Sequence, residues 1–249
     1  MKFLENWAII EKLLFFGLIP GILGAVYLIP QPIKDAHFIL NRINFSLESL
    51  FLTNYVHSEF SHFLGNLVVY LIVIYLIMSL EKDKTKFYKI TSLIFLLLPI
   101  ILSAFTFKFL PQIAQSQGFS GIVAALIGYL AYALLTFLKI KWDIKVNKYF
   151  VYLIIMINLL IAFKSYAIPF WVLAILAMLG LILLYANSLG LHQLIKTLIE
   201  KAATMGSKPL QFGYAFIYCF FIFLFLFSLP ALIEIMPQSG PVSNVLVHY

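Results

Sequence analysis

Long apolar runs are the feature that most limits how this chain can fold. Seven of them approach or reach the length of a membrane-spanning helix, and short polar or basic stretches separate them. In hydrocarbon every backbone polar group must be satisfied internally, and a helix does this within a single segment. The predicted spans are Leu13–Ile29, Ser61–Leu80, Phe87–Phe107, Phe119–Leu138, Tyr149–Phe163, Ile168–Ala186 and Gln211–Ile233. The sequence therefore predicts an all-α, polytopic transmembrane helix bundle.

Composition agrees with this class and excludes several others. The chain is 63% hydrophobic and only 11% charged, a balance that soluble globular domains do not have. Its single cysteine, Cys219, lies inside an apolar run, so no intrachain disulfide can form. The sequence has no spacing typical of a metal site and no phosphate-binding glycine loop. We therefore expect no metal and no other cofactor, and we do not expect the net charge of +7 to reflect nucleic-acid binding.

The basic residues predict the orientation in the bilayer. If the N-terminus is cytoplasmic, 13 of the 17 lysines and arginines lie on the cytoplasmic side, as the positive-inside rule requires. The four on the outside are Lys34, Arg42, Lys108 and Lys164. We therefore expect a multi-pass protein of the cell membrane with its C-terminus outside. Residues 30–56 are too polar to span but rich in apolar side chains, which predicts that they lie in the membrane interface.

The run Gly118-Phe119-Ser120-Gly121 opens the fourth predicted span from the outside. A helix start offers free backbone N–H groups and the positive end of the helix dipole, which suit a serine nucleophile whose reaction forms an oxyanion. The other interpretation is structural. Ser120 can cap the helix while Gly121, Ala125 and Gly128 form a stripe of small residues against a neighbouring helix. Taken alone, the motif favours this second interpretation.

A second polar set opens the second predicted span from the same side. His62 and Asn66 are four residues apart and share one helix face, with His57 shortly before them. Imidazole and amide groups can both donate hydrogen bonds to a developing negative charge. They can equally link helices to one another in lipid, and for Asn66 alone the two interpretations are even.

Together these residues resemble the rhomboid intramembrane serine proteases. His57, His62 and Asn66, at separations of five and four, resemble the family motif H-x-x-x-x-H-x-x-x-N, and Gly118 to Gly121 resembles its G-x-S-G. The resemblance covers residues from about 51 to 138. It implies a rhomboid-like fold in one membrane-embedded domain over residues 1–249. It also implies a serine endopeptidase that uses a serine–histidine dyad to cleave other proteins near or within their transmembrane helices.

The resemblance also implies roles for individual residues. Ser120 is the nucleophile, and His62, Asn66 and the Ser120 backbone N–H form the oxyanion hole. His57 is a supporting residue beside a water-filled entrance, and Gly118 and Gly121 support the turn that carries the serine.

The family supplies its general base from a later span, near the outer end. Of the two later histidines, His192 lies on the cytoplasmic side by the charge count, with ~30 Å of hydrocarbon between it and Ser120. We therefore expect His248, which lies outside, to be the base. The sequence given ends one residue later, and we expect a truncated C-terminus and a two-span insertion at residues 149–186. Ala124 stands where many family members have an aromatic residue against the base, which leaves the support of His248 open.

Two other functions stay open at this point. One is a catalytically inactive rhomboid-like protein that binds membrane helices without cleaving them. The other is a transporter that uses Asn66 and Ser120 as a polar site in the membrane. Against the transporter, no acidic residue lies deep in a predicted span and no pair of spans is broken.

Overall fold

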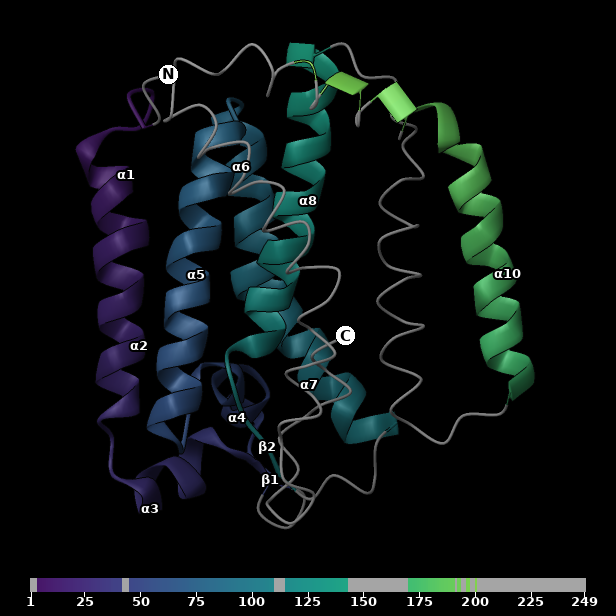
Figure 1. Ribbon diagram of the computed structural model, residues 1–249. Coiled ribbons are helices and arrows are strands. Elements are labelled where there is room, and N and C mark those ends of the chain that lie inside the picture. The colour runs from purple at the N-terminus through teal and green to yellow at the C-terminus, as the bar shows by residue number, and fades with distance from the viewer. Residues whose placement is uncertain are drawn as a thin grey trace. The chain divides into compact units, whose positions relative to one another are not determined.

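The protein is mostly helical in the part of the chain that the structure describes, which confirms the all-α class (Figure 1). This computed structural model describes residues 4–41, 45–109, 115–142, 170–190, 192–193, 196–197 and 200. The α-helices are α1 (Ile9–Leu13), α2 (Ile19–Tyr27), α3 (Gln31–Ile33), α4 (Leu47–Leu52), α5 (Phe60–Leu80), α6 (Lys84–Ser92), α7 (Leu98–Phe109), α8 (Ser120–Trp142) and α10 (Phe170–Ala186). π-Helical turns cover Leu14–Leu18, Lys34–Phe38 and Leu93–Leu97, and a 3₁₀ turn covers Thr53–Tyr55.

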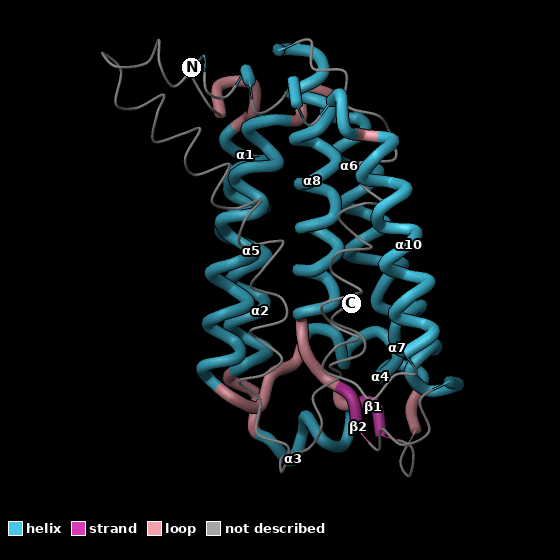
Figure 2. Tube along the Cα trace, turned by 45° about the vertical axis from the view of Figure 1, so that its right-hand side comes forward, coloured by secondary structure: helices cyan, strands magenta, loops and turns pink. Residues whose placement is uncertain are grey.

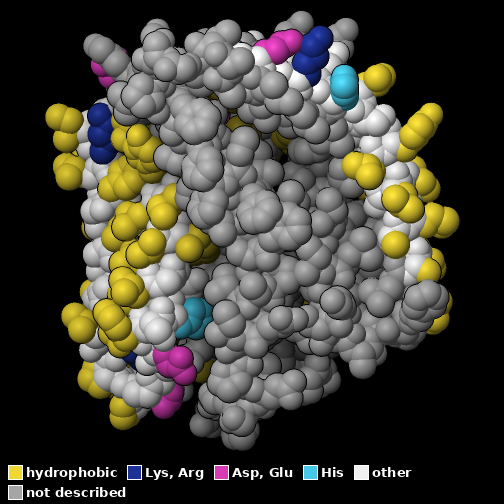
Figure 3. Space-filling model, in the orientation of Figure 1, with side chains coloured by type: hydrophobic (Ala, Val, Ile, Leu, Met, Phe, Trp, Pro, Cys, Tyr) yellow, Lys and Arg dark blue, Asp and Glu magenta, His cyan; other side chains and the backbone are white. Residues whose placement is uncertain are grey.

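Four of these helical stretches are long and apolar enough to cross a membrane. They are Ile9–Tyr27, Phe60–Leu80, Lys84–Lys108 and Ser120–Phe137, with 19, 21, 25 and 18 residues. Each overlaps one of the first four predicted spans, and the protein is therefore a membrane protein. On the face shown in Figure 3, hydrophobic side chains cover much of the described surface between the helix ends, as contact with lipid requires.

The later predicted spans are described only in part. Helix α10 falls within the predicted span 168–186 and has 17 apolar-rich residues. The predicted spans 149–163 and 211–233 lie outside the described residues. The chain divides into two compact units, one of residues 1–133 with 238–249 and one of residues 134–237. The predicted insertion at 149–186 falls in the second unit, and the candidate site lies in the first.

Two π-helical turns of the first unit each end two residues before a proline. Proline has no N–H to donate and its ring crowds the preceding turn, so a carbonyl group there needs another donor. Before Pro20, the Phe15 carbonyl accepts the Tyr70 hydroxyl at 2.8 Å. Before Pro99, the Phe95 carbonyl accepts the Tyr55 hydroxyl. Near each proline, a hydrogen bond from a tyrosine hydroxyl to a backbone carbonyl therefore joins the helix to the part of the chain around α5.

A cluster of aromatic rings forms the core next to the start of α8. Phe119 is fully buried, and its ring centroid lies 5.8 Å from those of both Tyr55 and Tyr70 and 6.1 Å from that of Phe95. Aromatic pairs at these separations add to the free energy gained by burial alone. Because Phe119 lies between Gly118 and Ser120, this packing holds the start of α8 in place.

The segment between α2 and α5 folds against the same end of the helices. Strand β1 (Leu40–Asn41) pairs antiparallel with β2 (Gln115–Ser116), which directly precedes α8 (Figure 2). Ile39 and Leu40 are each 3% exposed, so this segment has a core of its own. Its predicted location in the membrane interface stays a prediction.

At the other end of α5, charged side chains connect the helices. Glu81 is 8% exposed and pairs with Lys86 at 2.8 Å, while the Tyr129 hydroxyl donates to it at 3.3 Å. Glu11 of α1 accepts the Lys84 ammonium at 2.7 Å and the Tyr88 hydroxyl at 2.6 Å. These bonds join α1, α6 and α8 to the α5–α6 turn.

Candidate active site

The candidate site forms where the start of α5 meets the start of α8. The α5 side begins with His57, three residues before the helix, and continues with His62 and Asn66 on its first two turns. The α8 side consists of the loop at Gly118 and the first helical residue, Ser120. At the surface, Ser58 and Gln117 exchange side-chain hydrogen bonds at 2.8 and 3.0 Å. The two starts are thus held together directly.

Gly118 gives the loop its shape and brings two predicted site residues together. Its φ is +129°, a conformation that residues with a side chain rarely adopt. Its N–H donates to the Thr53 carbonyl at 2.9 Å. A Cβ atom at Gly118 would lie 3.6 Å from both Ser120 Oγ and His62 Cε1. The Ser120 hydroxyl and the His62 ring therefore both lie beside Gly118.

The His57 ring accepts hydrogen bonds from both sides of the site. Its Nε2 atom lies 2.9 Å from Asn66 Nδ2 and 3.3 Å from the Phe119 backbone nitrogen. A backbone N–H can only donate, so Nε2 must be the acceptor and the proton of a neutral ring must be on Nδ1. The same argument assigns Asn66 its orientation, with the amide NH₂ toward His57. One imidazole nitrogen thus positions both the Asn66 amide and the loop before Ser120.

Burial keeps His57 neutral. The side chain is 2% exposed, and burial lowers its pKa to about 3, with His62 and Lys34 adding to the effect. Its Nδ1 atom is buried and makes no hydrogen bond within the part of the chain that the structure describes. The water-filled entrance expected near His57 stays a prediction. The His57 ring packs edge to face with the rings of His62 and Phe63, at centroid distances of 5.2 and 5.7 Å.

The other polar residues at the two helix starts have different degrees of exposure. His62, Asn66 and Ser120 are half-buried, while Ser58 and Ser61 are exposed. Gly118 and Gly121 are buried in the turn and the first helical residues of α8. The predicted general base, His248, lies outside the described residues. The structure therefore brings together His57, His62, Asn66, Gly118 and Ser120, and the histidine of the dyad stays a prediction.

Two residues that the sequence analysis did not assign to the site support it. Lys34 is 3% exposed, and its ammonium donates to the carbonyls of Tyr27 at 2.6 Å and His57 at 3.1 Å. Burial lowers the Lys34 pKa. Thr53 accepts the Gly118 N–H through its carbonyl and the Leu40 N–H through its hydroxyl, at 2.9 and 3.1 Å. Nothing in the sequence pattern distinguishes either residue, because both act through backbone groups that only folding brings near.

The arrangement contains groups that acyl-transfer chemistry can use. Ser120 is the first residue of a 23-residue helix, where the N–H groups of the first turn have no helical acceptor. Half-buried imidazole and amide groups lie on the adjoining helix. Among the described residues, no group of three or more His, Cys, Asp or Glu side chains could hold a metal ion.

Comparison of the chain with models of protein families, with curated proteins and with solved structures finds no match.

Proposed function

We propose that this protein is an intramembrane serine protease of the rhomboid type that cleaves other membrane proteins near or within their transmembrane helices. The proposal rests on the position of Ser120 Oγ and the His62 ring, which both lie beside Gly118. The same two helix starts also contain Asn66, oriented by His57. A serine, two potential oxyanion donors and a helix N-terminus therefore share one site.

The chemistry would proceed as an acyl transfer. Ser120 Oγ attacks the scissile carbonyl carbon, and its proton passes to a histidine that acts as general base. The carbonyl oxygen becomes negative and accepts hydrogen bonds from the Ser120 backbone N–H, Asn66 and His62. The C–N bond then breaks, and the leaving amine takes the proton from the histidine. Water hydrolyses the acyl-enzyme by the same steps in reverse order.

His248 is the proposed base, on the strength of the resemblance and the charge count. By that count it emerges on the same side of the membrane as Ser120, whereas His192 does not. The proposed topology has seven spans in the chain given, the N-terminus in the cytoplasm and the site toward the outer face of the cell membrane. The lysine-rich turn Glu81–Lys86 then lies in the cytoplasm.

A second function has some support in the geometry. The Asn66 amide already donates to His57, so one of its two N–H groups is occupied before any substrate arrives. A rhomboid-like protein without catalysis could retain such a bond and bind membrane helices without cleaving them.

Fragment mapping in the membranes of cells that make the protein separates the two functions. We expect wild-type protein to generate new termini within or near the spans of other membrane proteins, and Ser120→Ala to generate none. Ser79→Ala is the matched control, because among the described residues the Ser79 hydroxyl bonds only within its own helix, to the Tyr75 carbonyl at the far end of α5. Identical fragments from wild type and Ser120→Ala would contradict the protease. Intact helices that co-purify with both forms, with no fragments from either, would support the helix-binding protein instead.

A further inference from the structure

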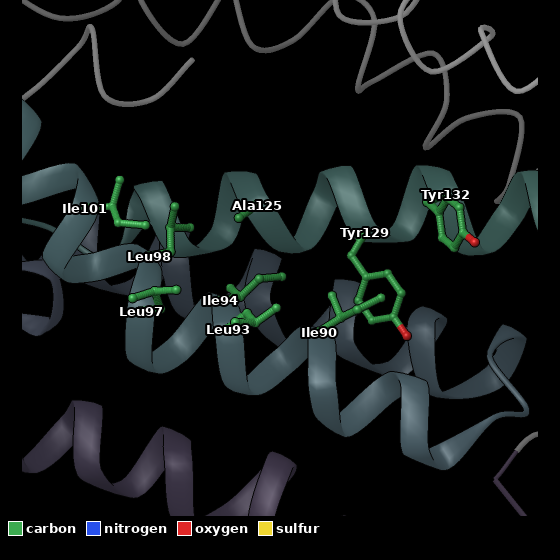
Figure 4. Close-up of a pocket in the computed structure, with 9 residues that line it drawn as sticks. All are labelled: Ile90, Leu93, Ile94, Leu97, Leu98, Ile101, Ala125, Tyr129 and Tyr132. Carbon is green, nitrogen blue, oxygen red and sulfur yellow. The ribbon is translucent and has the colours of Figure 1, made fainter.

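An apolar groove follows the line where the α6–α7 stretch packs against α8 (Figure 4). It has a volume of about 520 Å³, within the usual range for ligand sites. Leu93, Leu97 and Ile101 form one wall, and Ala125 and Tyr129 contribute from α8. Its lining is almost wholly apolar. The three aliphatic side chains of the first wall are each about half exposed, so the groove opens toward the surface of the first unit.

The groove has a cationic end. Tyr132 lines it there, and the Lys86 ammonium lies 4.4 Å from the centroid of that ring. The charge of Lys86 is matched by Glu81 at 2.8 Å. Lys89, almost one turn further along α6, is exposed, and its ammonium has no carboxylate partner in the described part of the chain. Lys89 precedes the groove residue Leu93 by four positions, so the two share a helix face.

The length of the groove indicates what can fill it. Its lining residues on the α6–α7 stretch run from Ile90 to Ile101, which corresponds to ~16 Å along a helix axis. The hydrocarbon core of a bilayer is ~30 Å thick, so this length is roughly that of one leaflet. A transmembrane helix of a partner protein would need the full thickness. One acyl chain of a lipid, which belongs to a single leaflet, fits the length and the apolar lining.

We infer that this groove binds an acyl chain of an anionic phospholipid, with the phosphate headgroup at Lys89. Lysines near a membrane surface attract anionic headgroups, and Lys89, unlike Lys86, has no carboxylate partner among the described residues. A free phosphate would gain the charge interaction alone, whereas a phospholipid also buries apolar surface. The inference requires only that the protein is in a bilayer and does not depend on proteolysis.

Native mass spectrometry of the purified, delipidated full chain tests this inference. The probes are phosphatidylglycerol and phosphatidylcholine with identical acyl chains, added separately at matched concentrations. We expect the wild type to retain phosphatidylglycerol about fivefold more strongly, the preference that one unpaired lysine near a headgroup typically confers. Lys89→Gln should remove this preference and leave phosphatidylcholine binding unchanged. Lys12→Gln is the matched control, because it removes one charge from α1, a helix that contributes nothing to the groove.

The groove itself is tested by filling it. Ala125→Leu places a larger side chain on the α8 wall and should lower the binding of both lipids. Leu97→Trp changes a half-exposed residue of the rim and serves where Ala125→Leu does not fold. Glycerol phosphate, which has the headgroup chemistry without acyl chains, should not displace the bound lipid. Three results would each overturn the inference. The first is an equal loss of the phosphatidylglycerol preference in Lys89→Gln and Lys12→Gln. The others are unchanged lipid binding in a folded groove variant and displacement of the bound lipid by glycerol phosphate.

Discussion

The two ends of α5 hold polar side chains in different ways. At the Ser120 end, the bonds of the His57 ring join neutral groups, through one nitrogen to the Asn66 amide and the Phe119 N–H. At the Glu81 end, carboxylates bind lysines and tyrosines, as in the pair Glu81–Lys86. The first set leaves reactive groups half-buried in a defined geometry. The second set connects helices.

This difference indicates which substitutions should change the reaction rate of Ser120 and which should change the free energy of unfolding. A carboxylate as buried as Glu81 needs a cation, and loss of either partner leaves an uncompensated charge. At the Ser120 end, most of the reactive groups remain partly open to water, so a truncated side chain there can be replaced by solvent at lower cost.

Asn66→Ala should slow the reaction of Ser120 with a fluorophosphonate by about 10²- to 10³-fold, because it removes one proposed oxyanion donor. The free energy of unfolding in detergent–SDS mixtures should change little. Gln117→Ala is the control, since it removes a hydrogen bond to Ser58 at the same helix starts without removing an oxyanion donor. A folding defect in Asn66→Ala, with a normal rate per folded molecule, would instead favour a role in linking helices.

Glu81→Gln should lower the free energy of unfolding by about 3 kcal/mol, because it removes the charge that pairs with Lys86 in a largely buried site. The labelling rate of Ser120 per folded molecule should stay at the wild-type value. Unfolding in detergent–SDS mixtures measures the first quantity and fluorophosphonate kinetics the second. Glu59→Gln, at the exposed N-cap of α5, should change stability by less than about 0.5 kcal/mol. If Glu81→Gln slowed the labelling of Ser120 as much as Asn66→Ala, the two ends of α5 would not differ in function as proposed.

His57 should make stability depend on pH. Its pKa is about 3 in the folded protein and ~6.5 when unfolded, so the unfolded state binds the proton first as pH falls. Stability should therefore decrease below pH ~6.5, by about 2 kcal/mol between pH 7.5 and pH 5. His57→Gln keeps an acceptor oxygen but cannot titrate, and its unfolding should depend less on pH over this window. An equal pH dependence in His57→Gln would show that other groups cause the effect.

Glu11→Gln should lower the free energy of unfolding by about 1 kcal/mol, less than Glu81→Gln. The reason is that the Lys84 side chain is 40% exposed, so water can hydrate it. The same unfolding measurement applies. Lys84→Gln on its own and combined with Glu11→Gln completes a double-mutant cycle that isolates the pair. A coupling energy above that of Glu81 with Lys86 would contradict the ranking by burial.

Hydropathy predicted the described spans well, because a bilayer selects for apolar length. The second predicted span, Ser61–Leu80, differs from α5 by one residue. The third, Phe87–Phe107, missed the first turn of α6, where the Asp83 side chain accepts the Lys86 N–H as a helix cap. An apolar run carries no information about such polar caps.

The first span shows a related limit. It was predicted to begin at Leu13, but the helix begins at Ile9 and includes Glu11. That carboxylate is tolerated because Lys84 and Tyr88 bind it, and both are more than 70 residues away in sequence. Only the folded chain shows this compensation.

The sequence also predicted which residues would meet at the site, but not how they are held. Spacing and charge placed His57, His62, Asn66 and Ser120 at one end of two helices. The buried, accepting role of His57 could not be predicted, because it depends on the Phe119 N–H, 62 residues later in the chain. The contribution of Lys34 was missed for the same reason, since its acceptors are two backbone carbonyls.

Residue-level mapping of a fluorophosphonate adduct tests whether Ser120 is an activated nucleophile. The protein would be treated with the reagent in the membranes of cells that make it, digested and analysed by mass spectrometry. The claim that this helix start activates its serine predicts one phosphonylated residue, Ser120, and loss of the adduct in Ser120→Ala and His248→Ala. An adduct on another serine, or none in folded wild-type protein, would contradict it.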